Sequence, residues 1–339
     1  MRNRITVCTV LAAGFCAGGA MAAETTKKAP KGLVNPALSG TFQPAAGEYL
    51  STTTVRARNI DVQVSSDTFG GDFLEIETLE QQIEERIQYG LTSRMTLSLT
   101  FSHKTNTDDQ TYSQGYKTAV QYQTAQALGI APDLVDIGTV DGTVDTRGVT
   151  DPVIDLRWSE TAAGMLITVG ASYSPDTGKA LEGDLERAGN HRRGGDETSV
   201  HARISRRLFT ITSLSLSGTV TTTGKSDSLG NDEEMVHDPD LKLRAEYGFA
   251  LARSVVGTVY YERDFQGKDR TKVDGATIGT AKPEPLNVYF AGAAYAPTPN
   301  MTIGAGGAMF TQKSTTASSV TTNADIEGVG YGMSFGLRM

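Results

Sequence analysis

Cysteine is almost absent from this chain of 339 residues: the sequence holds only Cys8 and Cys16. With none beyond the first sixteen residues, the chain cannot be a small secreted scaffold held together by disulfides. Long apolar runs are just as scarce. Beyond about residue 20, no stretch approaches the ~18 consecutive apolar residues that a transmembrane helix needs. Because the mean hydropathy is −0.26, any membrane-spanning structure must be sought in alternating strands.

Positive charge is also in short supply, with 31 Lys and Arg against 39 Asp and Glu and a formal net charge of −8. This balance disfavours nucleic acid as a partner. The sequence has no phosphate-cradling glycine loop, zinc-ligand spacing or haem motif. The letters GxSxG occur at Gly332–Gly336, but within the alternating final segment and not at the strand-to-helix turn of a nucleophile elbow. We therefore expect no cofactor, no metal ligands and no catalytic residues, and the chain is not predicted to be an enzyme.

The N-terminus has the organisation of a secretory signal. Two arginines precede an apolar stretch that ends in Ala20-Met21-Ala22, a small-x-small cleavage site, so we assign residues 1–22 to a signal peptide. A lipoprotein signal at Cys16 fits less well because the bulky Phe15 precedes it. Residues 23–47 show no periodicity, and we expect a periplasmic arm or a small plug inside a barrel.

Strict apolar–polar alternation marks the last residues of the chain. The apolar positions are Val329, Tyr331, Met333, Phe335, Leu337 and Met339, with Gly330, Gly332, Ser334, Gly336 and Arg338 between them. A strand of this kind is typical of the closing strand of an outer-membrane β-barrel. We therefore expect an all-β fold over residues 48–339: a transmembrane, antiparallel, up-and-down barrel of about twelve strands, with an error of two. Similar patterns predict strands at 49–64, 76–90, 94–105, 151–160, 163–173, 198–208, 211–223, 239–251, 254–265, 285–296, 300–313 and 326–339.

Three segments fit this scheme less simply. Residues 77–89 alternate as a strand, yet three apolar residues also form an i, i+4 stripe, so a helix is an alternative. The first strand changes phase between Ala57 and Ile60, which indicates a bulge or a misplaced boundary. Lys117–Leu128 is a candidate helix within the longest loop.

The connections alternate between short and long, as the periplasmic turns and extracellular loops of an outer-membrane barrel do. An even number of strands places both termini on the periplasmic side. The long loops are rich in Asp and Glu, and we interpret them as solvated loops near lipopolysaccharide rather than as calcium sites, because they lack the spacing of an EF-hand. The expected partners are outer-membrane lipid and lipopolysaccharide, the barrel assembly machinery and a small solute.

If the apolar faces contact lipid, the opposite faces line the lumen. The charged and histidine residues predicted there are Glu80, Glu84, Arg86, Asp155, Arg157, His201, Arg203, Lys242, Arg244, Glu246, Glu262 and Arg338. Charges of both signs in a confined interior can filter solutes. They can equally pair across strands and fill a narrow barrel. Both interpretations remain open at this point.

A short phrase in the sequence resembles a known family. Tyr89–Leu99 is similar to a strand–turn–strand segment of outer-membrane proteins grouped as the phenol-degradation meta-pathway family, and Tyr247–Arg253 and Tyr331-Gly332 echo it. The resemblance covers about thirty residues. It implies a barrel that admits small, often aromatic or hydrophobic molecules. The chain departs from the usual closing signal because Met339 replaces a terminal aromatic residue, so we expect Phe335 to serve in recognition by the assembly machinery.

These observations favour passive passage of a small solute through a narrow, charge-lined lumen. The first alternative is a structural or surface-interaction barrel that acts through its extracellular loops. The second is an outer-membrane lipid-modifying enzyme, for which His201 is the best candidate base.

Overall fold

The structure is a computed structural model of the chain. It describes residues 44–66, 71–129, 131–132, 141–175, 182–183, 196–209, 211–224, 226–227, 233–252, 254–273, 276–298, 300–317 and 322–339. The predicted signal peptide and most of the predicted N-terminal arm lie outside the described residues. No helix in these ranges is long and apolar enough to cross a membrane.

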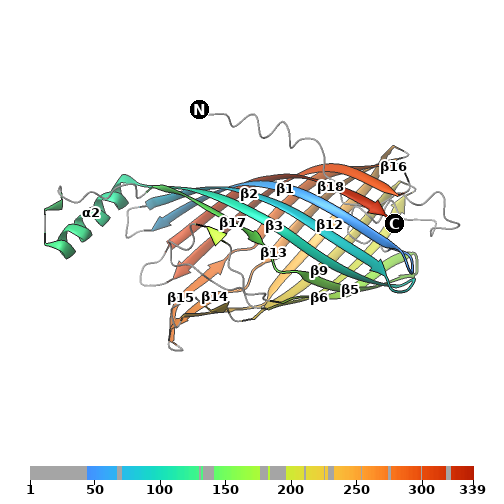
Figure 1. The fold of residues 1–339 in the computed structure, drawn as a ribbon, viewed down its shortest axis with the longest axis horizontal. Helices are drawn as coiled ribbons and strands as arrows, with labels where there is room; N and C mark the ends of the chain where they lie inside the picture. Colours follow the sequence, from blue (N-terminus) through green and yellow to red (C-terminus); the bar gives the residue numbers. More distant parts are fainter. Residues whose placement is uncertain are drawn as a thin grey trace.

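Twelve antiparallel strands form a closed barrel, which confirms the predicted fold (Figure 1). They are β1 (Tyr49–Ser66), β2 (Gly71–Gly90), β3 (Met95–Tyr112), β5 (Val153–Ala162), β6 (Met165–Ser174), β8 (Glu197–Phe209), β9 (Thr212–Thr223), β12 (Asp240–Ala252), β13 (Val255–Phe265), β16 (Leu286–Thr298), β17 (Met301–Ala317) and β18 (Thr322–Arg338). Each strand pairs with the next, and β18 pairs with β1 to close the wall. Residues 77–89 belong to β2, so the strand interpretation of that segment is confirmed and the helix alternative is wrong.

The wall is longer at the loop end than the sequence predicted. Shorter strands continue it there: β4 (Gly142–Val149), β7 (Glu182–Gly183), β10 (Ser226–Asp227), β11 (Glu233–His237), β14 (Asp269–Val273) and β15 (Ala276–Pro283). The predicted loop 106–150 therefore contains paired strand at both ends, because the upper part of β3 pairs with β4. Between them, helix α2 (Gln114–Leu128) confirms the predicted helix.

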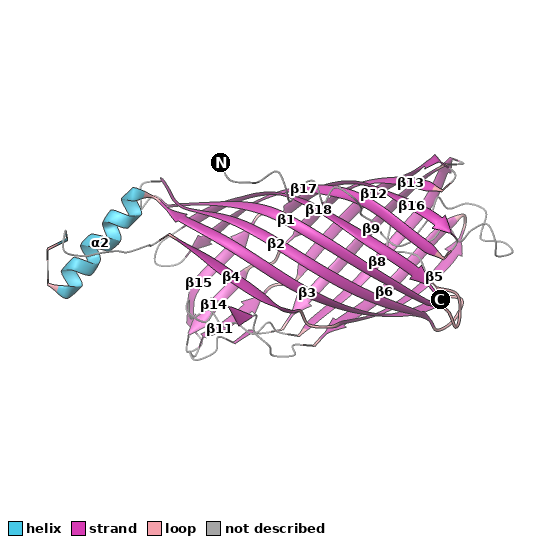
Figure 2. Cartoon of the chain, turned by 45° about the horizontal axis from the view of Figure 1, so that its top comes forward, coloured by secondary structure: helices cyan, strands magenta, loops and turns pink. Residues whose placement is uncertain are grey.

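Helix α2 projects beyond the barrel at the end opposite the C-terminus (Figures 1 and 2). The Ser113 side chain caps its N-terminus by accepting a hydrogen bond from the backbone N–H of Tyr116, and Gly129 ends it in a left-handed conformation. Lys117 on the helix donates to Asp141 just before β4, at 2.5 Å. This bond, together with one from the backbone N–H of Tyr112, holds the pKa of the Asp141 carboxyl below its usual range.

The wall is apolar outside and polar inside. On β8, Val200 and Ile204 are exposed, whereas Ser199, Arg203 and Ser205 are buried. Exposed large apolar side chains recur on all twelve strands. A continuous apolar exterior of this kind is unstable in water and matches the lipid-facing band of a transmembrane barrel.

The phase change in the first strand has a different cause from the one predicted. A bulge at residues 57–60 is wrong, because the register of β1 against β18 runs without a break from Leu50↔Arg338 to Ser65↔Asn323. Instead, the alternation of the two faces continues unbroken, so Ile60 and Val62 lie on the same inner face as Arg56 and Arg58. Asp61 between them is exposed on the outer face. The strand thus reverses its polarity near the loop end, with apolar side chains inside and polar ones outside.

Candidate functional site

The candidate site is the interior of the barrel. All twelve predicted interior residues lie on the side of their strands opposite the exposed apolar residues. Five of them are buried: Glu80, Asp155, Arg203, Glu246 and Glu262. Their participation in a pore stays a prediction, and their contacts show which of them come together.

Asp155 on β5 collects three cationic or basic side chains. The Arg157 Nε atom lies 2.5 Å from one carboxylate oxygen, Arg86 Nη2 of β2 lies 3.7 Å from it, and His201 Nε2 of β8 lies 3.6 Å from the other. These residues come from three strands that are not adjacent in the sheet. An acid buried to this degree requires such counter-charges.

Small residues on the intervening strands allow these pairs to form. The inner face of β3 carries Ser98 and Thr100 beside Asp155 and Arg86, so long side chains reach over it. On β6, Gly170 lies under the His201 ring, since an added Cβ would stand 2.7 Å from His201 Cε1. From β2 to β12, charged strands thus alternate with strands whose inner face carries small side chains, a pattern that is visible in the sequence.

A second cluster contains residues that the sequence interpretation missed. Arg56 and Arg58 of β1 pair with Glu84 at 3.3 Å and with Glu80 at 3.5 Å. Lys104 of β3 reaches Glu80 from the other side, at 2.6 Å. The phase change in β1 concealed the two arginines, although their i, i+2 spacing places them on one face.

A third cluster joins β12 to β13. Glu262 lies 2.5 Å from Arg244 Nη2 and 3.7 Å from Lys242 Nζ, and Lys242 also reaches Asp264 at 3.3 Å. The Arg244 guanidinium stacks over the Tyr260 ring, 4.2 Å from its centroid. Elsewhere on β12, Glu246 pairs with Arg203 of β8 at 3.0 Å across the small inner face of β9.

Arg338 stands apart from these clusters, at the end where the short turns lie. It bonds to Glu48. Partial burial alone would raise the pKa of Glu48, but hydrogen bonds from Arg338 and from the Ala45 backbone N–H outweigh burial and hold it below its usual range. Pro44 and Ala45 cover the inner face of Gly90, where an added Cβ would lie 2.7 Å from the Pro44 carbonyl oxygen. The last residues of the predicted arm therefore contact the interior at this end.

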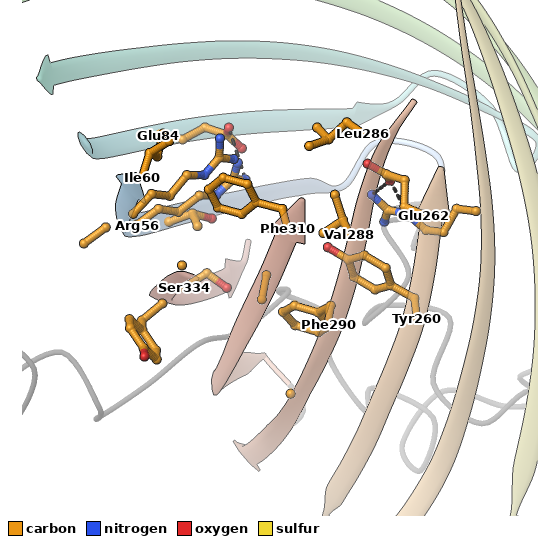
Figure 3. Close-up of a pocket in the computed structure, with 18 of the residues that line it drawn as sticks. Arg56, Ile60, Glu84, Tyr260, Glu262, Leu286, Val288, Phe290, Phe310 and Ser334 are labelled. Carbon is orange, nitrogen blue, oxygen red and sulfur yellow. Dashed lines mark hydrogen bonds and ion pairs between the residues drawn. The ribbon is translucent and has the colours of Figure 1, made fainter. Parts of the chain in front are cut away.

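A cavity of about 780 Å³ lies inside the wall, bordered by β1, β2, β12, β13 and β16 to β18 (Figure 3). Charged residues line it at two places, Arg56, Arg58 and Glu84 of the second cluster at one and Lys242, Arg244 and Glu262 of the third at the other. The lining between these places, on β16 to β18, is apolar and includes Val288, Phe290 and Phe310. Among the described residues, no group of three or more His, Cys, Asp or Glu side chains is placed to hold a metal ion.

Glycines let the two phenylalanines lie flat against the wall. A Cβ on Gly306 would stand 2.6 Å from the Phe290 ring, and one on Gly292 would stand 2.7 Å from it. Gly328 gives the Phe310 ring the same room. The rings occupy space that any larger residue would need, so these glycines keep aromatic side chains close to the wall and out of the cavity.

No protein-family model and no curated protein sequence matches the chain. Among solved structures, an outer-membrane channel from Pseudomonas putida F1 is similar at 12% identity and a TM-score of 0.54, over 93% of this chain and 100% of that one. A Pseudomonas aeruginosa FadL homologue has 11% identity, a TM-score of 0.46 and coverage of 96% and 99%. A mutant of the TodX monoaromatic hydrocarbon channel has 10% identity, a TM-score of 0.46 and 95% coverage of both chains.

The barrel, its apolar exterior and the likeness to the Pseudomonas putida barrel define the class of the protein. The chain is a bacterial outer-membrane β-barrel. At this level of identity the likeness concerns the fold, so the function has to be argued from the interior.

Proposed function

We propose that the chain is a passive channel for a small solute across the outer membrane. The observation that carries this proposal is the cavity of about 780 Å³ enclosed by the wall, which falls within the range of small-molecule sites. No nucleotide-binding motif is present in the sequence, so passage is driven by the gradient of the solute.

The geometry of the ion pairs favours an open lumen over a filled one. Arg56–Glu84 and Arg244–Glu262 join neighbouring strands, and Arg203–Glu246 joins strands with one strand between them. Pairs of this reach lie along the wall rather than across the diameter. The charges therefore satisfy one another without bridging the lumen.

The test is the current that the folded, full-length protein carries in a planar bilayer, with a matched pair of variants. Val288→Trp places a bulky side chain in the cavity, whereas Val259→Trp places the same side chain on the exposed outer face of β13. We expect steps of current from the native protein, smaller steps from Val288→Trp and unchanged steps from Val259→Trp. A folded protein that is silent, or variants that behave alike, would contradict the proposal.

Helix α2 supports a second candidate function, the binding of a surface partner. It stands beyond the wall (Figure 2) and exposes Tyr122 and Leu128. A deletion that tests this role must spare β3 and β4, because both pair within the wall. Removing residues 115–128 should abolish partner binding without changing conductance, and retained binding would eliminate this candidate.

No catalytic role is proposed for His201. A general base must present its ring nitrogen to a substrate, but this ring lies on Gly170 with its Nε2 atom facing Asp155. We infer that His201 belongs to the polar wall. Lipid, lipopolysaccharide and the assembly machinery remain the proposed partners of the barrel itself.

A further inference from the structure

The lining of the cavity is unequal in charge. Of its charged side chains, two are carboxylates, Glu84 and Glu262. The cationic ones are Arg56, Arg58, Arg86, Lys242 and Arg244. Five positive charges against two negative ones leave an excess of three positive charges around the cavity, in a chain whose formal net charge is −8.

The excess arises because the carboxylates are less exposed to the cavity than the cationic side chains with which they pair. Glu262 lies between Lys242 and Arg244, and its side chain is 8% exposed, against 44% and 32% for the two cations. Glu80 lies between Arg58 and Lys104 and is 9% exposed, against 43% for Arg58. A solute in the cavity therefore meets ammonium and guanidinium groups, while the carboxylates that neutralise them lie deeper in the wall. Such a surface attracts anions.

Another part of the lining is apolar. Its inward side chains are Ile60, Val62, Leu286, Val288, Phe310 and Ile326. Around Ile60, Val62 and Ile326 the outward neighbours are polar: Asp61 and Glu327 face each other in the register of β1 and β18 and are both exposed. Beside Val288 and Phe310 the outward neighbours Tyr289 and Met309 are exposed, so the wall there is apolar on both faces. Apolar side chains turned toward a wet interior, away from a polar exterior, are the opposite of what a membrane wall requires and mark a binding surface.

An aromatic pair joins the third cluster to the apolar part of the lining. Tyr260 stacks on Phe290 with ring centroids 4.6 Å apart (Figure 3). The Arg244 guanidinium lies over the Tyr260 ring, 4.2 Å from its centroid. A ligand whose flat or branched apolar body lies against Phe290 would thus bring a polar group at its end to the cationic side chains of the third cluster. The cavity is large enough for both the apolar body and the polar group of such a ligand.

We propose that this cavity binds amphipathic organic anions, with the apolar body against β16 to β18 and the carboxylate at Lys242 and Arg244. The proposal rests on the proposed channel function for the route by which the ligand arrives. It adds a ligand class, because a cavity selective for neutral hydrophobic solutes would gain nothing from exposed cations.

The experiment measures the affinity of a ligand for the purified full-length protein in detergent by isothermal titration calorimetry. This readout does not depend on whether the protein conducts. The probe is 4-butylbenzoate, compared with the neutral 4-butylbenzamide and with acetate, which has the charge but no apolar body. We expect 4-butylbenzoate to bind at least about tenfold more tightly than either comparator, since a charge-assisted bond adds to apolar contact. Its affinity should fall as salt is raised.

Variants assign the two parts of the ligand to the charged and the apolar parts of the lining. Lys242→Gln should weaken 4-butylbenzoate and leave 4-butylbenzamide unchanged, whereas Val288→Ser should weaken both. Their controls are Lys313→Gln on the exposed loop end of β17 and Val259→Ser on the lipid face, neither of which should alter binding. Loss of binding in Lys242→Gln with native circular dichroism supports the proposal.

Equal affinity for the benzoate and the benzamide, or no binding of either, would overturn the anion site. These results would leave the channel proposal standing if the native protein still conducts. Conversely, benzoate binding by a protein that carries no current would support the site and contradict the channel. The two failures are therefore distinguishable.

Discussion

The pair formed by Arg203 and Glu246 allows the sharpest prediction about the stability of the wall. Their side chains meet at 3.0 Å and are 8% and 6% exposed. They link β8 to β12 across β9, so the contact depends on the closed arrangement of three strands. Glu246→Gln removes the negative charge with little change in shape.

The expected loss follows from the burial of the remaining charge. Removing one partner of a buried ion pair costs about 3–5 kcal/mol. Ser205 Oγ still accepts a hydrogen bond from Arg203 Nε at 3.1 Å, which places the expected loss in the free energy of unfolding at the lower end, about 3 kcal/mol. Replacing both partners by apolar residues, as in Arg203→Met with Glu246→Leu, should recover most of this loss.

The assay is equilibrium unfolding by denaturant of the protein folded in lipid vesicles. Glu75→Gln is the matched control, because Glu75 is exposed at the loop end of β2, and it should change the free energy of unfolding by less than about 0.5 kcal/mol. Equal losses in Glu246→Gln and Glu75→Gln would refute the reasoning. So would a double variant less stable than Glu246→Gln alone.

Two further predictions concern the cavity and the helix. Gly328→Ala should push the Phe310 ring into the cavity and reduce the bilayer current. Gly307→Ala is the control, because its added Cβ has only ordinary contacts at 3.5 Å, and it should leave the current unchanged. Equal currents from the two variants would contradict this role of Gly328. Because the Lys117 bond lowers the pKa of Asp141, its contribution is present at neutral pH and is lost as pH falls through that lowered pKa. The protection factor of the α2 amides, which compares their exchange rate with that of an unstructured chain at the same pH, should therefore fall in acid. Asp141→Asn should show the acid-level protection factor at pH 7, and a protection factor that neither change alters would contradict a stabilising role for the Lys117–Asp141 bond.

Alternation predicted the wall well because the physical cause is local. Leu241 and Leu243 alternate with Lys242 and Arg244 in the sequence, and in the structure the leucines are exposed to the lipid side while the cations lie inside. A period of two states only that a strand has two different faces. It does not state which face is inside, and Ile60 shows the consequence, since near the loop end the wall has an apolar interior.

The contacts within the site could not be read in the same way, because they depend on register between distant segments. Arg203 and Glu246 are 43 residues apart and meet over β9, whose inner face presents Ser215 and Ser217. The sequence identified both charges as interior residues but not as a pair. Arg56, missed because its strand changes phase, pairs with a residue that was expected, Glu84.

The most direct test of the channel proposal is the single-channel current of the folded, full-length protein in a planar bilayer, recorded beside its Val288→Trp variant. We expect discrete steps of current from the native protein and markedly smaller steps from the variant, because the substituted side chain occupies the cavity. Silence from a protein shown to be folded, or steps that the substitution leaves unchanged, would contradict the channel proposal.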